Sequence, residues 1–239
     1  MNYSNFKEEM NNQLDSLKIE LNEDQMKAFF NFMNLLIEKN KVMNLTGITE
    51  PKEIILKHFI DSLTISKYIE NNQKVIDIGT GAGFPGIPLK IENNTLDLCL
   101  LDSLNKRINF LNEVIEEDKL TNVTTVHGRA EDFGQNIDYR EKFDVSVSRA
   151  VAPLNVLLEY MIPFIKVGGM CICMKGNITE EEINSSKNAL NKLGGEIKKI
   201  ERFTLADTDN NRTIILVKKT KQTTKDYPRN SGTPSKKPL

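Results

Sequence analysis

The spacing of hydrophobic positions along the chain changes near residue 71. Before that point, apolar residues of segment 22–40 recur at three- and four-residue intervals, which predicts an amphipathic helix. Asn22 stands where an N-cap is expected, and Gln25 follows three residues later as its capping-box partner. A second helical stretch is predicted at about 52–68. We therefore expect residues 1–70 to form a helical extension that contributes no strand.

After residue 71, short apolar runs alternate with helical stretches. We expect strands at 74–78, 96–101, 123–127, 143–148, 170–175, 197–204 and 213–218, and helices at about 87–92, 106–119, 154–165 and 180–193. Such alternation predicts an α/β fold with a doubly wound, mostly parallel sheet. The last two strands have no helix between them and are expected to form an antiparallel edge hairpin. A seven-stranded sheet of this kind is the arrangement of Rossmann-like class I methyltransferases, which we expect over residues 71–219.

Composition narrows the class of protein. The chain has 239 residues, of which 39% are hydrophobic and 27% charged, as expected for a packed domain. No apolar run approaches the roughly 18 residues that a membrane helix needs. Three cysteines in apolar runs, with a polar N-terminus, indicate a reducing cytoplasm and no disulfide framework.

Charge is unevenly distributed. The formal net charge is −1, but the segment 218–239 holds seven Lys and Arg residues against one Asp. This segment therefore carries +6 and residues 1–217 carry −7. Apolar residues are rare in 220–239, so we expect a basic disordered tail there. A body this acidic does not attract nucleic acid by net charge, and RNA binding would need local basic patches or the tail.

The strongest motif follows the first predicted strand, where Asp77 leads into Gly79, Gly81, Gly83 and Gly86. Glycines allow a sharp turn and close approach of the backbone to a ligand. In open α/β sheets, ligands bind outside the carboxyl ends of the strands. The glycines at 81, 83 and 86 also match the dinucleotide fingerprint, so an NAD-dependent oxidoreductase is the alternative interpretation.

Two residues favour S-adenosylmethionine over a dinucleotide. Pro85 lacks an N–H group in the stretch where a dinucleotide site needs donors for pyrophosphate. Asp77 would repel a pyrophosphate, whereas it suits the cationic amino group of a methionine moiety. An oxidoreductase would also need a catalytic donor or acceptor pair, which we do not find in the sequence.

Three further strand ends carry candidate ligand contacts. Asp102 ends the second strand, where its carboxylate either accepts ribose hydroxyls or caps the next helix. Ala130 and Glu131 follow the third strand and either contact adenine or form the acidic start of a helix. Arg149 closes the fourth strand, where it faces the reaction centre, forms an ion pair with Asp77 or Glu131, or does both.

Several other chemistries are disfavoured. Two histidines and three cysteines show no zinc spacing, so we expect no metal site. The fourth strand lacks the Asn/Asp-Pro-Pro-Tyr/Phe site of exocyclic-amine methyltransferases, and no Pro-Cys pair offers a nucleophile for pyrimidine C5. Cys171 and Cys173 are expected in the core. His58 is expected to face the cleft with Asp61 or to be a packed helix residue.

The chain resembles the RsmG (GidB) family of bacterial small-subunit ribosomal RNA guanine-N7 methyltransferases. The resemblance covers about 29–217. The blocks that carry it are 44–46, 58–63, 76–89, 101–103 with 106–107, 129–131, 148–150 and 175–176.

The resemblance implies that S-adenosylmethionine is bound at Gly79, Phe84, Ala130, Glu131 and Arg149. It implies methylation of guanine N7 in a single-stranded loop of 16S ribosomal RNA. Because N7 already holds a nucleophilic in-plane lone pair, no general base is needed, and we assign no catalytic residue. Catalysis would then be mainly orientation, which can supply up to roughly 7–11 kcal/mol.

The expected partner is 16S ribosomal RNA or a precursor of the small ribosomal subunit, bound by a monomer without a membrane partner. We expect a basic surface beside the cofactor mouth, formed by Lys106, Arg107 and Arg149, with further contributions from Lys57, Lys175 and Arg202. The tail would add nonspecific attraction to phosphate. A third interpretation is a non-catalytic RNA-binding module that binds through this tail.

Overall fold

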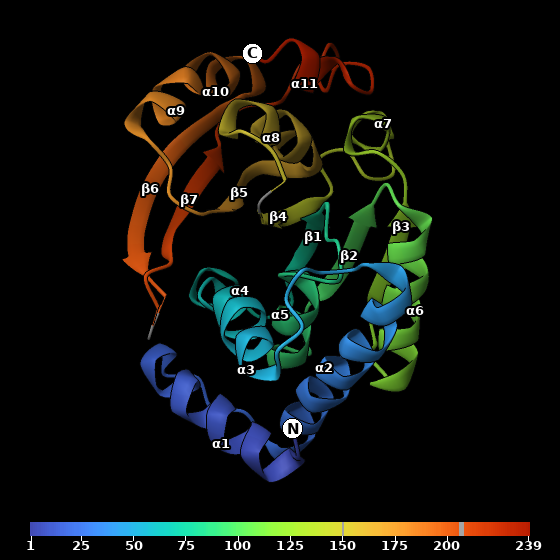
Figure 1. Cartoon of the computed structure of the whole chain (residues 1–239). Helices are drawn as coiled ribbons and strands as arrows, with labels where there is room; N and C mark the ends of the chain where they lie inside the picture. The colour runs from blue at the N-terminus through green and yellow to red at the C-terminus, as the bar shows by residue number, and fades with distance from the viewer. Residues whose placement is uncertain (150, 206–207) are drawn as a thin grey trace.

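A seven-stranded sheet forms the centre of the computed structural model, which describes residues 1–149, 151–205 and 208–239 (Figure 1). Ala150, part of one motif above, lies outside the described residues. The strand order is β3-β2-β1-β4-β5-β7-β6, with β7 antiparallel to both neighbours. This confirms the predicted fold class and the edge hairpin. The strands are β1 (Lys74–Ile78), β2 (Asp97–Asp102), β3 (Val123–His127), β4 (Phe143–Arg149), β5 (Ile165–Lys175), β6 (Gly195–Thr204) and β7 (Asn211–Lys219).

Alternating strand residues supply two hydrophobic clusters, one on each face of the sheet. Val75 joins the cluster beneath the N-terminal helices, whereas its neighbour Ile76 joins the other cluster. The first face is covered by α2 (Glu23–Met43), α5 (Gly86–Glu92) and α6 (Asn105–Glu117). The second is covered by α7 (Ala130–Gln135), α8 (Leu154–Met161), α9 (Glu180–Ser185) and α10 (Lys187–Leu193). Both faces are therefore buried, as a mainly parallel sheet requires.

The N-terminal extension, residues 1–70, is helical, as expected from the sequence. The predicted capping box is present, since the side chains of Asn22 and Gln25 each accept a hydrogen bond from the other's backbone N–H. Helix α1 (Tyr3–Leu14) was not predicted. The stretch expected as one helix is divided into α3 (Pro51–Ile54), the π-helical turn η2 (Ile55–Ile60), α4 (Asp61–Leu63) and the 3₁₀ turn η3 (Ser66–Tyr68).

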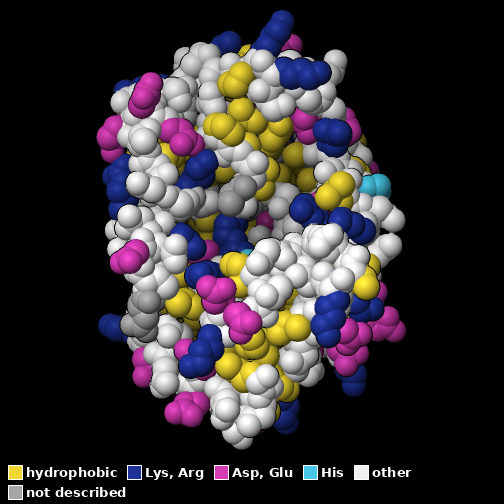
Figure 2. Space-filling model, in the orientation of Figure 1, with side chains coloured by type: hydrophobic (Ala, Val, Ile, Leu, Met, Phe, Trp, Pro, Cys, Tyr) yellow, Lys and Arg dark blue, Asp and Glu magenta, His cyan; other side chains and the backbone are white. Residues whose placement is uncertain are grey.

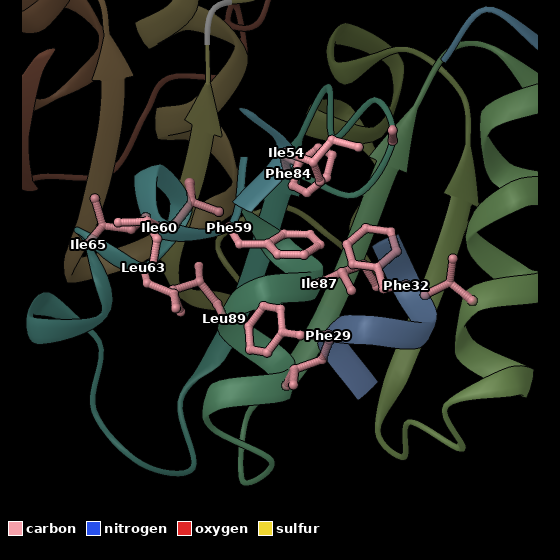
Figure 3. Close-up of a cluster of buried hydrophobic side chains, with 14 of the residues drawn as sticks. Phe29, Phe32, Ile54, Phe59, Ile60, Leu63, Ile65, Phe84, Ile87 and Leu89 are labelled. Atoms are coloured by element: carbon pink, nitrogen blue, oxygen red, sulfur yellow. The ribbon is translucent and has the colours of Figure 1, made fainter. Parts of the chain in front are cut away.

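Aromatic packing joins this extension to the glycine loop (Figure 3). The ring of Phe32 in α2 lies 5.5 Å from that of Phe59 and 5.3 Å from that of Phe84, measured between centroids. Phe29 adds a contact to Phe59 at 5.0 Å. All four rings are buried, so the extension and the sheet share one core. Helices of the extension thus pack against the loop that carries the glycines and support it.

The expectation of a disordered tail at 220–239 is corrected by the structure. This segment packs against α7 and α8, outside the helices that cover the second face of the sheet, and contains the short helix α11 (Thr233–Lys236) (Figure 1). The Arg140 guanidinium donates to the carbonyls of Thr223, Thr224 and Tyr227 at 2.7–3.0 Å. Arg229 pairs with the buried Glu159. Composition failed here because hydrogen bonds from the body, and not apolar side chains alone, fix the segment.

Two expected helices end or break earlier than predicted. The helix expected at 154–165 ends at Met161, before Pro163, and a 3₁₀ turn leads into β5. The helix expected at 180–193 is divided at Ser186, whose hydroxyl donates to the Ile183 carbonyl. At the position of helix α7, the sequence indicated only a loop that could lead into the first turn of a helix.

Candidate functional site

A cleft lies outside the carboxyl ends of β1 to β4, at the point where the strand order reverses. It has two lobes with Gly79, Asp102, Ser103 and Val151 in common. We call the first the Glu131 lobe; it holds about 490 Å³ of space, open solvent included, and is lined by Ile78, Gly79, Leu101, Asp102, Ser103, Gly128, Arg129, Ala130, Glu131, Val151 and Tyr160. We call the second the Arg149 lobe; it holds about 890 Å³ on the same measure and is lined by Leu45, Thr46, His58, Gly79, Thr80, Gly81, Ala82, Phe84, Asp102, Ser103, Arg107, Arg149 and Val151.

The glycine loop borders both lobes. Gly79 and Gly81 have φ angles of +69° and +63°, which side chains with a Cβ rarely adopt. A Cβ at Gly79 would lie 2.8 Å from Val151 Cγ2. A Cβ at Gly81 would meet nothing within 4 Å, so its backbone faces open space. The loop therefore brings bare backbone to the cleft, as predicted.

Asp77 lies beneath this loop, and it is not among the residues that line either lobe. The carboxylate is fully buried, and its Oδ2 accepts hydrogen bonds from Thr80 Oγ1 at 2.7 Å and from Gly86 N at 2.8 Å. Burial raises its pKa to about 7, against the opposing effects of these bonds and of Arg149. The Oδ1 atom is buried without a partner among the described residues. Asp77 therefore closes the loop, and any influence on a ligand acts across the loop.

Asp102 stands where the two lobes meet, at the end of β2. Its Oδ2 accepts from Gly81 N at 2.9 Å and from Arg107 Nη1 at 3.1 Å, while Oδ1 accepts from Leu104 N at 2.9 Å. The sequence left ribose binding and helix capping open for this carboxylate, and the structure does not show capping: Leu104 is the N-cap of α6, and no described side chain caps the helix. A carboxylate has about four acceptor positions, so further hydroxyl donors can share this one.

The Glu131 lobe is supported by the C-terminal segment. Ala130 and Glu131 begin α7 and line the lobe, as expected from the sequence. Glu131 Oε1 accepts from Gly232 N at 2.8 Å, and Ser231 Oγ donates to Asp132 at 2.7 Å. Tyr160 of α8 also lines the lobe and was not predicted.

Aromatic and cationic groups stack in the Arg149 lobe. The imidazole of His58 lies 4.3 Å from the ring of Phe84 at an interplanar angle of 15°, and the Arg149 guanidinium lies 5.1 Å from the Phe84 centroid. His58 contacts Thr46 Oγ1 at 2.9 Å through Nε2 and Arg149 Nη2 at 3.0 Å through Nδ1. Burial, followed by the charge of Arg149, lowers the pKa of His58 to about 3, so the ring is neutral at pH 7.

A buried carboxylate holds two arginines at the edge of the Arg149 lobe. Asp61 is 2% exposed, and its two oxygens accept from Arg149 Nη1 at 3.0 Å and from Arg212 Nε at 2.8 Å. Arg149 thus forms its ion pair with Asp61, whereas the sequence suggested Asp77 or Glu131. Burial lowers the pKa of Arg149 from its usual high value, and Asp61 opposes this effect. Asp61 and Arg212 were missed as partners because they are 151 positions apart in the chain.

The other predicted basic residues divide between the cleft and its surroundings. Arg107 lines the Arg149 lobe through its bond to Asp102. Lys106 instead donates to the Met43 carbonyl at 2.7 Å, at the end of α2, and does not line the cleft. Arg202 pairs with Glu180 on the exposed surface. Figure 2 shows dark-blue side chains around the central hollow of the visible face.

The described residues fit the expected cofactor. An elongated cleft with open space beside Gly81, and with Asp102 and Glu131 along its walls, suits a ligand with ribose hydroxyls, an amino group and an adenine. The described residues contain no cluster of three metal-ligating side chains and no helix suited to crossing a membrane. Burial raises the pKa of Cys171 to about 12 and raises that of Cys173 well above its usual value, so both are core thiols, as predicted.

Comparison with known proteins gives consistent matches. Residues 25–214 match the GidB family model, described as rRNA small subunit methyltransferase G. The Ribosomal RNA small subunit methyltransferase G of Acetivibrio thermocellus is 55% identical over 92% of this chain and 91% of that protein. The protein of the same name from Alkaliphilus oremlandii is 51% identical over 93% of this chain and 94% of its own length.

Solved structures are similar in fold at low sequence identity. TYW2 from M. jannaschii, solved in complex with AdoMet, has a TM-score of 0.55 at 16% identity and covers 66% of this chain and 74% of its own. Trm5b from Pyrococcus abyssi has a TM-score of 0.53 at 16% identity and covers 71% of this chain and 50% of its own. These structures share the overall fold of this chain, and the comparisons give no support to an oxidoreductase.

Proposed function

The chain belongs to the rRNA small subunit methyltransferase G (GidB) family, and we propose that it methylates N7 of a specific guanosine in 16S ribosomal RNA. It is an S-adenosylmethionine-dependent methyltransferase. The names of the relatives supply the ribosomal RNA of the small subunit as substrate class. The choice of N7 rests on the family resemblance and on the chemistry of the cleft.

The cofactor would be held along the two lobes of the cleft. In this proposal Ala130 and Glu131 contact the adenine, Asp102 accepts the ribose hydroxyls, and Gly79 and Gly81 give the central part access to backbone. Phe84 and Arg149 border the methionine end. When bound, S-adenosylmethionine supplies an electrophilic methyl group on a sulfonium. Asp77 contributes by fixing the loop and by its charge, because it is buried beneath the glycines.

His58 is the only imidazole among the described residues that line the Arg149 lobe, and it cannot act as a general base there, which supports attack by N7. His58 has a pKa of about 3 and is hydrogen-bonded through both ring nitrogens, so it does not accept a proton at pH 7. A guanine N7 needs no deprotonation before it attacks a methyl group. An exocyclic amine, by contrast, must lose a proton during the reaction. The residues of the lobe can orient the base and exclude water, which is the main requirement for such a reaction.

The observation that carries this proposal is the cleft that places Glu131, Asp102, Gly81 and Arg149 around one elongated space at the strand ends. The test uses small-subunit ribosomal RNA from cells that lack the gene, and radiolabelled cofactor. We expect methyl transfer to one guanosine and no transfer when that guanosine is replaced by 7-deazaguanosine. Continued transfer to the 7-deaza substrate would exclude N7. Thermal-shift measurements with S-adenosylhomocysteine and NADH test the cofactor separately.

We further propose that the enzyme acts as a monomer in the cytoplasm, on 16S ribosomal RNA or on a precursor of the small subunit. The mixed charge of the surface, with basic residues around the hollow in Figure 2, supports local contacts to RNA. The C-terminal segment is a weaker candidate for such contacts than its composition suggested. Its Arg229 is engaged with Glu159 inside the protein.

A further inference from the structure

A second basic cavity adjoins the Arg149 lobe. We call it the Arg212 pocket; it holds about 800 Å³ of space, open solvent included, and is lined by Ile48, Lys57, His58, Asp61, Arg149, Met174, Lys175, Gly176 and Arg212. His58 and Arg149 line both this pocket and the Arg149 lobe. The side chains of these two residues therefore form the wall between the cofactor cleft and the Arg212 pocket.

Three adjacent strands bring the cations of this pocket together. In the register of the sheet, Arg149 of β4 pairs with Met174 of β5, and Lys175 of β5 pairs with Thr213 of β7. Arg212 is the neighbour of Thr213, so it stands at the same edge of the sheet. Because β7 runs antiparallel, its beginning lies beside the carboxyl end of β5, which in turn lies beside that of β4. The pocket thus continues the binding edge of the sheet beyond the cofactor cleft.

The lining of the Arg212 pocket is cationic. Lys57, Arg149, Lys175 and Arg212 stand against one carboxylate, Asp61, whose two oxygens are bound by the two arginines. Lys57 also pairs with Glu53 at 2.5 Å, and Lys175 pairs with Glu182 at 3.0 Å and donates to the Ala152 carbonyl at 2.7 Å. These two glutamates are not among the residues that line the pocket. Their ion pairs hold the lysines in place, and the cavity itself presents an excess of positive charge.

Such a lining suits a phosphate of the substrate strand. Arginine binds phosphate with a planar array of donors, and lysine adds a compact charge. Since His58 and Arg149 line both the pocket and the Arg149 lobe, an RNA strand whose base entered the lobe would bring its backbone close to the pocket. On the basis of the proposed function, we propose that the Arg212 pocket binds a backbone phosphate next to the target guanosine of the RNA.

The test compares RNA substrates that carry a neutral methylphosphonate at single positions around the target guanosine. For the wild-type enzyme, we expect one or two of these positions to raise the Kd about tenfold. In the variant Lys57→Gln/Arg212→Gln, the same replacements should have less than a twofold further effect. The salt dependence of RNA binding should also fall by about 0.7 in slope for each phosphate that the variant no longer binds. Lys192→Gln, at an exposed position of α10, is the matched control and should behave as wild type.

Folding and cofactor binding are followed in the same samples. We expect the Kd for S-adenosylhomocysteine to be unchanged in the variants, which distinguishes weaker RNA binding from damage to the cofactor cleft. Lys57→Gln alone, at a partly exposed side chain, is measured as well in case the Arg212 variant does not fold. If the wild-type enzyme methylates the RNA but the variants keep its full sensitivity to every methylphosphonate, the phosphate site is refuted and the function stands. Absence of transfer to small-subunit RNA by the wild-type enzyme would overturn both.

Discussion

The C-terminal segment is expected to contribute to stability through the ion pair between Arg229 and Glu159. Glu159 is fully buried in α8, and its Oε1 accepts from Arg229 Nε at 2.9 Å and from Arg229 N at 2.8 Å, while Oε2 accepts from Arg229 Nη2 at 2.6 Å. The arginine side chain is 24% exposed. Arg229→Ala would remove two of these three bonds and leave a buried carboxylate with one donor.

Removing one partner of a buried ion pair costs about 3–5 kcal/mol because the remaining charge stays desolvated. We expect about 3 kcal/mol for Arg229→Ala, the lower end of that range, since the arginine is partly exposed and its backbone N–H bond is retained. With an m-value of about 3 kcal/mol/M, the midpoint of urea unfolding should fall by about 1 M. Lys225→Ala, an exposed position in the same segment, removes one positive charge and should shift the midpoint little.

A double variant separates the ion pair from its surroundings. Glu159→Leu/Arg229→Met replaces both charges by apolar groups and should recover part of the loss, because no carboxylate then remains buried. If Arg229→Ala lowered the free energy of unfolding by less than about 1 kcal/mol, the segment would not be held as the structure shows. The disordered tail that the composition suggested would then describe it better.

Three other outcomes follow from the cleft. Gly81→Val should abolish binding of S-adenosylhomocysteine in calorimetry while the protein still folds. The reason is that the site needs a φ angle of +63° and open space beside the backbone. Undiminished affinity would exclude a close contact between this backbone and the ligand. Asp77 has a pKa of about 7 without cofactor, so binding of the cationic cofactor should tighten between pH 6 and 8 as the carboxyl ionises. Asp77→Asn should flatten this dependence and weaken binding by less than the roughly 1.5–3 kcal/mol of a direct hydrogen bond to a charged group, because Asp77 lines neither lobe. A wild-type pH profile in that variant would refute the role. In the folded state the pKa of His58 is about 3, below its ordinary 6.5, so the unfolded state binds more protons between these two pH values. The free energy of unfolding is therefore lost as pH falls through that window. The contribution of this residue should approach 1.36 kcal/mol per pH unit, and it should be missing in urea titrations of His58→Gln.

The sheet was predictable because its signals are local. Each parallel strand is a short apolar run that ends at a polar or glycine residue, and β1 and β3 have the predicted bounds. The residues that line the cleft were predictable for the same reason, since Asp102, Ala130 and Arg149 all follow directly from strand ends. Once the order of strands is fixed, those ends meet at one edge of the sheet.

The role of Asp77 was not predictable to the same degree. Alternation along β1 does not say whether the carboxylate faces the cleft or the loop above it. The structure shows that Thr80 and Gly86 bind the same carboxylate oxygen, which closes the glycine loop around Asp77. The Asp61–Arg149–Arg212 group was missed because it joins α4 to β4 and β7, and no local pattern couples these segments.

Net charge predicted the role of the C-terminal segment poorly, for a physical reason. The division into a −7 body and a +6 tail counted charges without their partners. In the structure Lys219 binds Glu141 at 2.6 Å and Arg229 binds Glu159, so the basic segment neutralises acids of the body that it covers. Its backbone then reaches Glu131 at the cofactor cleft through Gly232 N. Deleting 220–239 would therefore expose buried carboxylates and disturb the Glu131 lobe, and it should weaken cofactor binding as well as any attraction to RNA. An unchanged Kd for S-adenosylhomocysteine in a folded truncated chain would show that the lobe does not depend on this support.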